Sequence, residues 1–176
     1  DNIPWESDAP TTGTTLRNAL RYLNGETTGT NISSRVVNAV FALNKEYPEI
    51  AANYDATLVD IEQDVPVNAY YVPNGTDYDV YFLANDAIFA PQDCESLFSG
   101  MNKLVTVDAQ NLDVSRVTNA KNMFLKCPAL KSVFGTADWD TGNITCMSSM
   151  FDYCGSLVDL EVGNWDTSNV TAMDWM

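Results

Sequence analysis

Carboxylates and thiols are the side chains that could do chemistry in this chain, because it has 24 Asp and Glu and 4 Cys but no His. The absence of histidine excludes Ser-His-Asp and Cys-His catalysis, histidine proton shuttles and every imidazole metal site. Two carboxylates about 5–10 Å apart could still hydrolyse a glycoside. The acidic residues, however, follow turns and one face of predicted strands. We therefore expect a protein that is not an enzyme and needs no cofactor.

The cysteines give little support to redox or zinc chemistry, because Cys94, Cys127, Cys146 and Cys154 include no CxxC pair. Cys127 and Cys154 hold the same position in an internal repeat, and we expect both to be small core residues. The even number of cysteines permits disulfides without requiring them. Cys146 is interpreted either as a reactive thiol at the start of a helix or as an accidental replacement.

One acidic stretch, DWDTGN at 138–143, is similar to part of a calcium loop, but Ser149 stands where an EF-hand needs Glu. We expect no metal site here. Four Asn-x-Ser/Thr sequons are no more than chance gives in a chain rich in Thr and Asn, and they need no glycan. They begin at Asn31, Asn74, Asn143 and Asn169.

The chain repeats itself from Leu97 onward with a period of 26 to 27 residues. Phe98, Phe124 and Phe151 are equivalent, and so are the Asp residues that follow Leu112, Trp139 and Trp165. The third copy contains NWDTSNVTAM and the second DWDTGNITCM, whereas NLDVSRVTNA in the first copy is less similar. Stacked copies would place like side chains on top of one another and build one continuous core.

Each copy is predicted to be a strand, a turn, a helix and a turn. Leu157, Leu160 and Val162 have the spacing of the short strand in a leucine-rich repeat. The second half has the stripe of one helix face: Ile144, Met147, Met150, Phe151 and Cys154. The predicted fold class is therefore α/β, a leucine-rich-repeat-like solenoid of strand-turn-helix units. Its turns hold an Asp that bonds local backbone amides: Asp113, Asp140 and Asp166.

The exposed face of the predicted strands is the candidate binding surface, because repeat proteins use this extended surface for partners. The alternation of the strand residues gives two outward columns: Thr106, Ser132 and Asp159, then Asp108, Phe134 and Glu161. Phe134 is an aromatic side chain among acids, a composition suited to anchoring a protein partner. An extra residue between Val133 and Trp139 leaves two alternatives open, since a bulge there could turn Phe134 inward.

The repeats resemble the BspA-like leucine-rich-repeat surface proteins of bacteria, whose copies carry WDTSNVT-x-M, then MF-x-x-C and a Leu. Here the matching segments are NWDTSNVTAM, DWDTGNITCMSSMFDYCGSL and VTNAKNMFLKCPAL. This chain departs from the pattern at Ala120, Gly142 and Cys146. The resemblance implies an exported, non-catalytic protein of the surface of a Gram-positive or related bacterium. Members of that family are associated with adhesion to host or partner proteins.

The segment before the repeats is predicted to be a small α+β unit over residues 14–90, preceded by a tail or linker over 1–13. A short helix begins near Leu16 and stops at Gly25 before a loop that runs to Thr30. Residues 36–43 predict a strand, with a helix as the alternative, and 45–54 a short helix. Strands over 67–72 and 78–83 flank a turn at 73–76 and form a hairpin. The three repeats then occupy 91–176.

Composition limits the classes of partner and the cellular compartments that fit this chain. Nine Lys and Arg against 24 Asp and Glu give a net charge of −15, which repels nucleic acid and anionic lipid. The longest apolar run, residues 39–43, is far below the roughly 18 residues of a membrane span. Together with this composition, the resemblance implies an extracellular or cell-surface bacterial protein, and we expect it to bind a protein or glycan.

The role of the chain and the state of its last copy each leave alternatives open. The chain could serve as a structural spacer in a longer surface protein, or as a carboxylate-based glycoside hydrolase. The last copy lacks a capping unit, so we interpret the chain as a fragment of a longer protein. The other interpretation is a dimer formed through the open C-terminal repeat.

Overall fold

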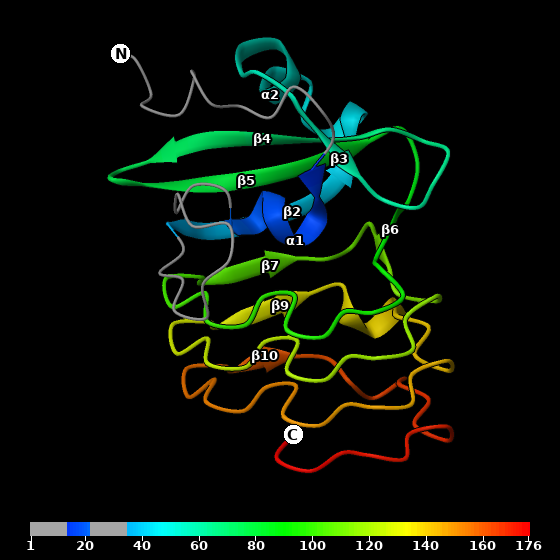
Figure 1. The fold of residues 1–176 in the computed structure, drawn as a ribbon. Helices are drawn as coiled ribbons and strands as arrows, with labels where there is room; N and C mark the ends of the chain where they lie inside the picture. Colours follow the sequence, from blue (N-terminus) through cyan, green and yellow to red (C-terminus); the bar gives the residue numbers. More distant parts are fainter. Residues whose placement is uncertain (1–13, 22–34) are drawn as a thin grey trace.

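One mixed sheet of eight strands organises the molecule, in the order β1-β3-β4-β5-β2-β7-β9-β10 (Figure 1). The computed structural model describes residues 14–21 and 35–176. The strands of this sheet are β1 (Thr14–Thr15), β2 (Val36–Leu43), β3 (Thr57–Asp60), β4 (Val67–Asn74), β5 (Asp77–Ala84), β7 (Thr106–Asp108), β9 (Ser132–Phe134) and β10 (Asp159–Leu160). A separate pair contains β6 (Ile88–Phe89) and β8 (Leu112–Asp113).

The predicted solenoid of strand-turn-helix units is wrong. The described residues contain two short α-helices, α1 (Leu16–Arg21) and α2 (Pro48–Asn53), and both precede the repeats. The single turns η2 (Asn44–Glu46) and η3 (Thr136–Asp138) are 3-10 helices. The stretch over 144–154, predicted to be helical, consists of turns and one isolated β-bridge.

Backbone geometry explains why a helical spacing did not give a helix. Ser149 (φ 53°) and Tyr153 (φ 58°) are left-handed, which ends each turn before a second can continue it. Within a turn the amide bonds back three residues, as from Met150 N to Met147 O (3.2 Å). Other amides bond to the neighbouring copy, as from Ser149 N to Asp174 O (2.8 Å). Apolar residues three or four apart therefore share a side without a helix.

The copies lie against one another in parallel register, as the repeat predicts. Thr106 pairs with Ser132 and Ser132 with Asp159, which aligns β7, β9 and β10. The rings of Phe98 and Phe124 stack at 4.7 Å, and those of Phe124 and Phe151 at 5.3 Å. The predicted phenylalanine column is confirmed.

The strands and helices predicted before the repeats are present, but the sequence did not predict β1, β3 and β6. β2 is a strand, β4 and β5 form the antiparallel hairpin, and Gly75 (φ 65°) lies in its turn. The helix expected over 45–54 is divided into η2 and α2, with Pro48 in the first turn of α2. The start of α1 is as predicted, while its predicted end, the loop after it and the tail over 1–13 lie outside the described residues.

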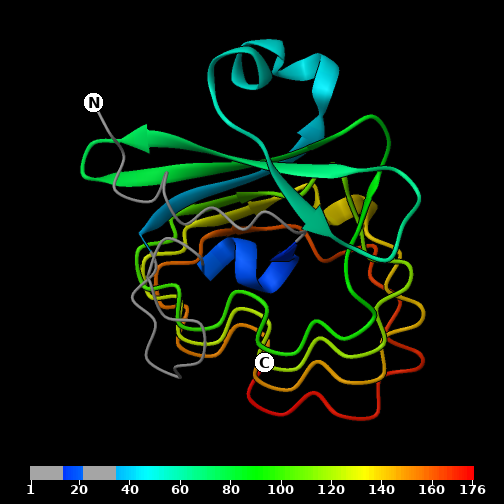
Figure 2. The ribbon, with the colours of Figure 1, turned by 45° about the horizontal axis from the view of Figure 1, so that its top comes forward.

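β2 joins the two parts of the chain, because it pairs in parallel with both β5 and β7. Phe41 on β2 packs edge-on against Phe98 of the first copy (6.4 Å). Figure 2 shows α1 and α2 on opposite sides of the sheet. The main core therefore runs without a break from α1 into the repeats. None of the helices found over 14–21 and 35–176 is long and apolar enough to span a bilayer.

Candidate functional site

The outward residues of β7, β9 and β10 form the surface that we call the strand face. Register places the predicted residues in their two columns, with Asp108 opposite Phe134. Glu161 follows β10 directly, and its backbone is held by the Thr136 hydroxyl. That hydroxyl donates to Glu161 O (2.9 Å) and accepts from Glu161 N (3.2 Å). The register of the two columns is therefore as expected, but the predicted exposure of the first column is wrong at Ser132.

The first column is mainly structural. Ser132 is only 6% exposed, so a partner could not reach it. The Thr106 hydroxyl donates to Asn38 Oδ1 (2.6 Å), and Asn38 Nδ2 donates to Asp79 Oδ1 (2.8 Å). Thr106 thus belongs to a polar chain across β7, β2 and β5, which leaves Asp159 as the exposed member of this column.

Phe134 points outward, which decides between the two alternatives that the sequence left open. It is 43% exposed. The extra residue of the second copy is taken up after the strand, where Gly135 (φ 79°) leads into η3. A Cβ on Gly135 would lie 2.6 Å from the backbone of Gln110, so the turn packs closely on the first copy.

A hollow of about 550 Å³ lies beside Phe134 at the end of β9, and we call it the Phe134 hollow. Three carboxylates line it, those of Asp138, Asp159 and Glu161. In the described part of the chain none of the three takes part in a hydrogen bond or an ion pair through its side chain. Sequence reasoning missed Asp138, because the extra residue before Trp139 hid its place next to the strand.

Two tyrosines extend the strand face toward the N-terminal strands. The rings of Tyr47 and Tyr81 lie 5.2 Å apart, and Tyr81 alternates outward on β5. Burial and then the carboxylate of Asp108 raise the pKa of Tyr47. Sequence reasoning missed this pair, although the alternation of β5 was a usable signal for Tyr81.

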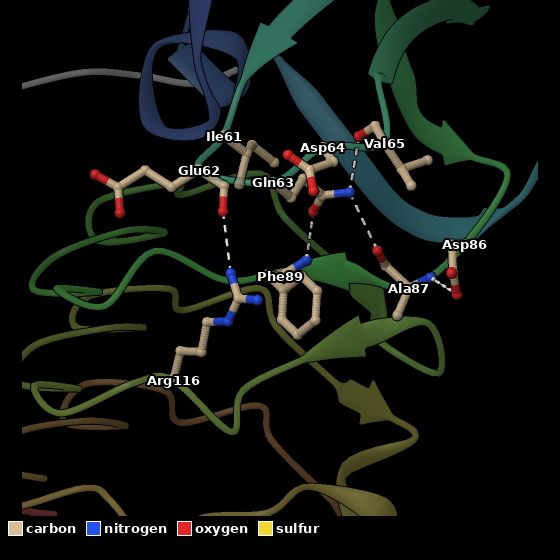
Figure 3. A pocket seen from close by; sticks show the side chains of 9 residues that line it. All are labelled: Ile61, Glu62, Gln63, Asp64, Val65, Asp86, Ala87, Phe89 and Arg116. Carbon is tan, nitrogen blue, oxygen red and sulfur yellow. Dashed lines mark hydrogen bonds between the residues drawn. The ribbon is translucent and has the colours of Figure 1, made fainter.

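A second hollow, shown in Figure 3, lies between the loop after β3 and the first copy. The side chain of Gln63 crosses it, donating to Val65 O (2.9 Å) and Ala87 O (3.2 Å) and accepting from Phe89 N (2.8 Å). The Arg116 guanidinium lies 3.7 Å from the centre of the Phe89 ring and donates to Glu62 O (3.0 Å). These contacts fasten the loop to the repeats, which is a structural role.

Arg116 stands where later copies have Asn, and the comparison explains both residue types. Asn143 Nδ2 donates to Ser115 O (2.8 Å), and Asn169 Nδ2 donates to Gly142 O (2.7 Å). Each Asn therefore ties its own copy to the preceding one. The first copy has the loop after β3 as its neighbour, and the longer Arg116 reaches that loop.

The turn aspartates act as predicted, each accepting from the amide two residues on. The acceptors are Asp113 (2.8 Å), Asp140 (3.1 Å) and Asp166 (2.9 Å). This hydrogen bond from Ser168 lowers the pKa of Asp166. Across the described residues, no group of three or more His, Cys, Asp or Glu side chains is placed to hold a metal ion.

The cysteines are free thiols, and the core role of Cys127 and Cys154 is confirmed by their exposures of 0% and 9%. Cys127 Sγ donates to Phe98 O (3.1 Å), and Cys154 Sγ donates to Phe124 O (3.0 Å). Burial raises the pKa of Cys94 to about 12. The Cys146 thiol lies 3.7 Å from the Ser148 hydroxyl.

A family model matches the repeats. Residues 92–176 match the model of a family described as "Mycoplasma protein of unknown function, DUF285". No curated protein and no solved structure matches the chain. The match is compatible with the BspA-like resemblance of the repeats, and it covers the same copies that form the strand face.

Proposed function

We propose that the chain is a non-catalytic interaction module of a bacterial cell surface, which binds a protein partner through the strand face. The observation that carries this proposal is Phe134. It is a large apolar side chain, 43% exposed, on strands whose register places carboxylates around it. Exposed aromatic side chains in a polar surround are common anchors of protein interfaces.

The compartment is part of the same proposal. The net charge of −15 and the resemblance of the repeats to exported bacterial proteins both support it. The family match supports the resemblance over residues 92–176. The turn aspartates also support a non-catalytic role, because local amides already occupy their carboxylates.

A binding screen tests the proposal directly. The protein is immobilised and screened against purified extracellular proteins and glycans, and each binder is measured again with the strand-face variants Phe134→Ala and Glu161→Lys. The matched controls are Leu58→Ala, since Leu58 is 51% exposed on β3, and Asp55→Lys. We expect binding to fall by about tenfold or more for the strand-face variants only. Equal losses in all four variants would contradict the proposal.

A carboxylate-based glycoside hydrolase is the second candidate, because the Phe134 hollow gathers three carboxylates in a space of about 550 Å³. Its test is the release of reducing sugar from a panel of bacterial and host polysaccharides. Activity that disappears in both Asp138→Asn and Glu161→Gln would establish the hydrolase. A protein without sugar release whose screen also yields no binder would instead be a structural spacer.

A further inference from the structure

The distribution of charge along the repeats specifies the chemistry of the partner. From Ser132 to the end of the sequence there is no Lys or Arg. The acidic residues of the same segment are Asp138, Asp140, Asp152, Asp159, Glu161, Asp166 and Asp174. On the strand face itself the charged side chains are those of Asp108, Asp159 and Glu161. This face therefore presents one sign of charge, and a partner of opposite charge is attracted to it.

The Phe134 hollow adds shape to this charge. The face of an aromatic ring attracts a cation, and carboxylates form strong hydrogen bonds with ammonium and guanidinium groups. Asp138, Asp159 and Glu161 line the same hollow as Phe134, and their carboxylates bond to no described residue. A cationic side chain placed there would contact the ring and relieve the repulsion among the carboxylates.

We propose that the strand face docks a basic, extended segment of the partner protein, with an arginine or lysine side chain in the Phe134 hollow. This inference rests on the proposed function and names the partner's chemistry. A second copy of the chain is a poorer occupant, because two acidic strand faces would repel each other. Beyond the hollow, Asp108 and the Tyr47–Tyr81 pair continue the same combination of acid and aromatic toward β5.

The test uses the whole chain and a fluorescent peptide of alternating Arg and Gly. Peptides with Lys, Gln or Glu in place of Arg serve as comparisons, and fluorescence anisotropy at two salt concentrations gives the Kd. We expect the Arg peptide to bind best, because guanidinium stacks on aromatic rings better than ammonium does. Binding should weaken with added salt, and the Gln and Glu peptides should not bind.

Matched variants distinguish binding at the strand face from nonspecific attraction of the peptide to a protein with a net charge of −15. Asp159→Asn with Glu161→Gln removes two charges from the strand face, and Asp55→Asn with Asp64→Asn removes two elsewhere. We expect the first pair to weaken binding by about tenfold and the second by less than about twofold. Phe134→Leu, which changes no charge, should weaken binding severalfold, and Phe134→Tyr should keep it. Far-ultraviolet circular dichroism and thermal melts confirm that each variant folds.

Equal effects of the two double variants would overturn the inference, because binding would then depend on net charge alone. If the Arg peptide does not bind, while Phe134→Ala still weakens the binding of a partner found in the screen, the inference is overturned and the proposed function stands. Failure of both the peptide and the screen would overturn the two together.

Discussion

The strands before the repeats and the strands within them differ in length and in what holds them. β2, β4 and β5 have eight residues each, whereas β7 and β9 have three and β10 has two. In the first region, cross-strand pairs along long ladders define the register. In the repeats most of each copy is turn, and stacked side chains with amide bonds between copies define it.

Both regions nevertheless share one core. Phe41 stacks on Phe82 (4.8 Å) and also contacts Phe98, the first member of the repeat column. The short strands of the repeats therefore begin on a long strand, β2, that is already paired on its other side. Copies with little regular secondary structure can therefore be ordered by packing against a neighbouring long strand. We expect the two regions to unfold in one transition.

The largest expected effect comes from the centre of the repeat column. Phe124 is 0% exposed and stacks on both Phe98 and Phe151. Phe124→Ala should lower the free energy of unfolding by about 3–5 kcal/mol, because it leaves a cavity in the stack. Urea unfolding, followed by circular dichroism and by tryptophan fluorescence, measures this change.

Phe134→Ala is the matched control, because it removes the same side chain from the surface, and it should cost less than about 1 kcal/mol. The two probes should give coincident transitions in both variants. If Phe124→Ala melts the repeats while the N-terminal strands stay folded, the shared core would not couple the regions.

A smaller effect is expected at the turn that the second copy adds. Gly135 has φ 79°, and a Cβ there would lie 2.6 Å from Gln110 Cα. Gly135→Ala should destabilise the protein by about 1–3 kcal/mol, through backbone strain and this close approach. Gly155→Ala is the control, since a Cβ at Gly155 would meet no atom within 4 Å and its φ is not positive. Thermal melts that give the same shift for both variants would refute the strain.

The two regions also differ in how well the sequence predicted them. β4 and β5 are rich in Tyr and Val and flank a turn that contains Pro-Asn-Gly, and this combination predicts a hairpin. In the repeats, the apolar spacing from Ile144 to Cys154 is compatible with either a helix or a series of turns. Left-handed Ser149 and Tyr153 select the turns, and neither residue type signals that conformation strongly.

The candidate site was predicted in part, where the repeat pattern alone determines which residues are neighbours. Register follows from the repeat alone, so the columns of Asp108 with Phe134 and of Ser132 with Asp159 could be derived. The hollow beside Phe134 depends on how Gly135 and η3 take up the extra residue. Asp138 lies in η3 itself, so its place in the hollow needed three-dimensional information.

Arg116 offers a way to loosen the contact between the regions without disturbing either core. Arg116→Asn gives the first copy the residue of the other two copies. It removes the hydrogen bond to Glu62 O and the contact with the Phe89 ring. We expect a loss of about 1 kcal/mol in the free energy of unfolding, measured in urea. Arg116→Lys should recover only part of it, because a single ammonium cannot make both contacts.

Hydrogen exchange locates the effect of Arg116→Asn. Faster exchange should be confined to the loop after β3, since Gln63 and Arg116 fasten this loop, whereas β6 is also paired with β8. Uniform acceleration over the whole sheet would show that the contact supports global stability and not the local junction.

The smallest expected effect concerns the ion pair that crosses the same junction at the other end of the sheet. Lys103 of the first copy lies 2.8 Å from Asp77 at the start of β5, and Arg35 lies 3.6 Å from the same carboxylate. In the folded protein, the hydrogen bond from Lys103 holds the pKa of Asp77 below its ordinary value of 3.8. Its stabilising contribution is therefore present above about pH 4 and is lost as the pH falls through the lowered value.

Asp77→Asn should remove this contribution at pH 7, and the difference from the parent protein should shrink as the pH falls through the lowered pKa of Asp77 and its carboxyl becomes protonated. The loss at pH 7 should be small and should shrink in high salt, since the side chain of Lys103 is 47% exposed. Urea unfolding of both proteins from pH 2 to pH 7 gives the difference. A difference that stays constant across this range would mean that Asp77 acts through its place in the hairpin and not through its charge.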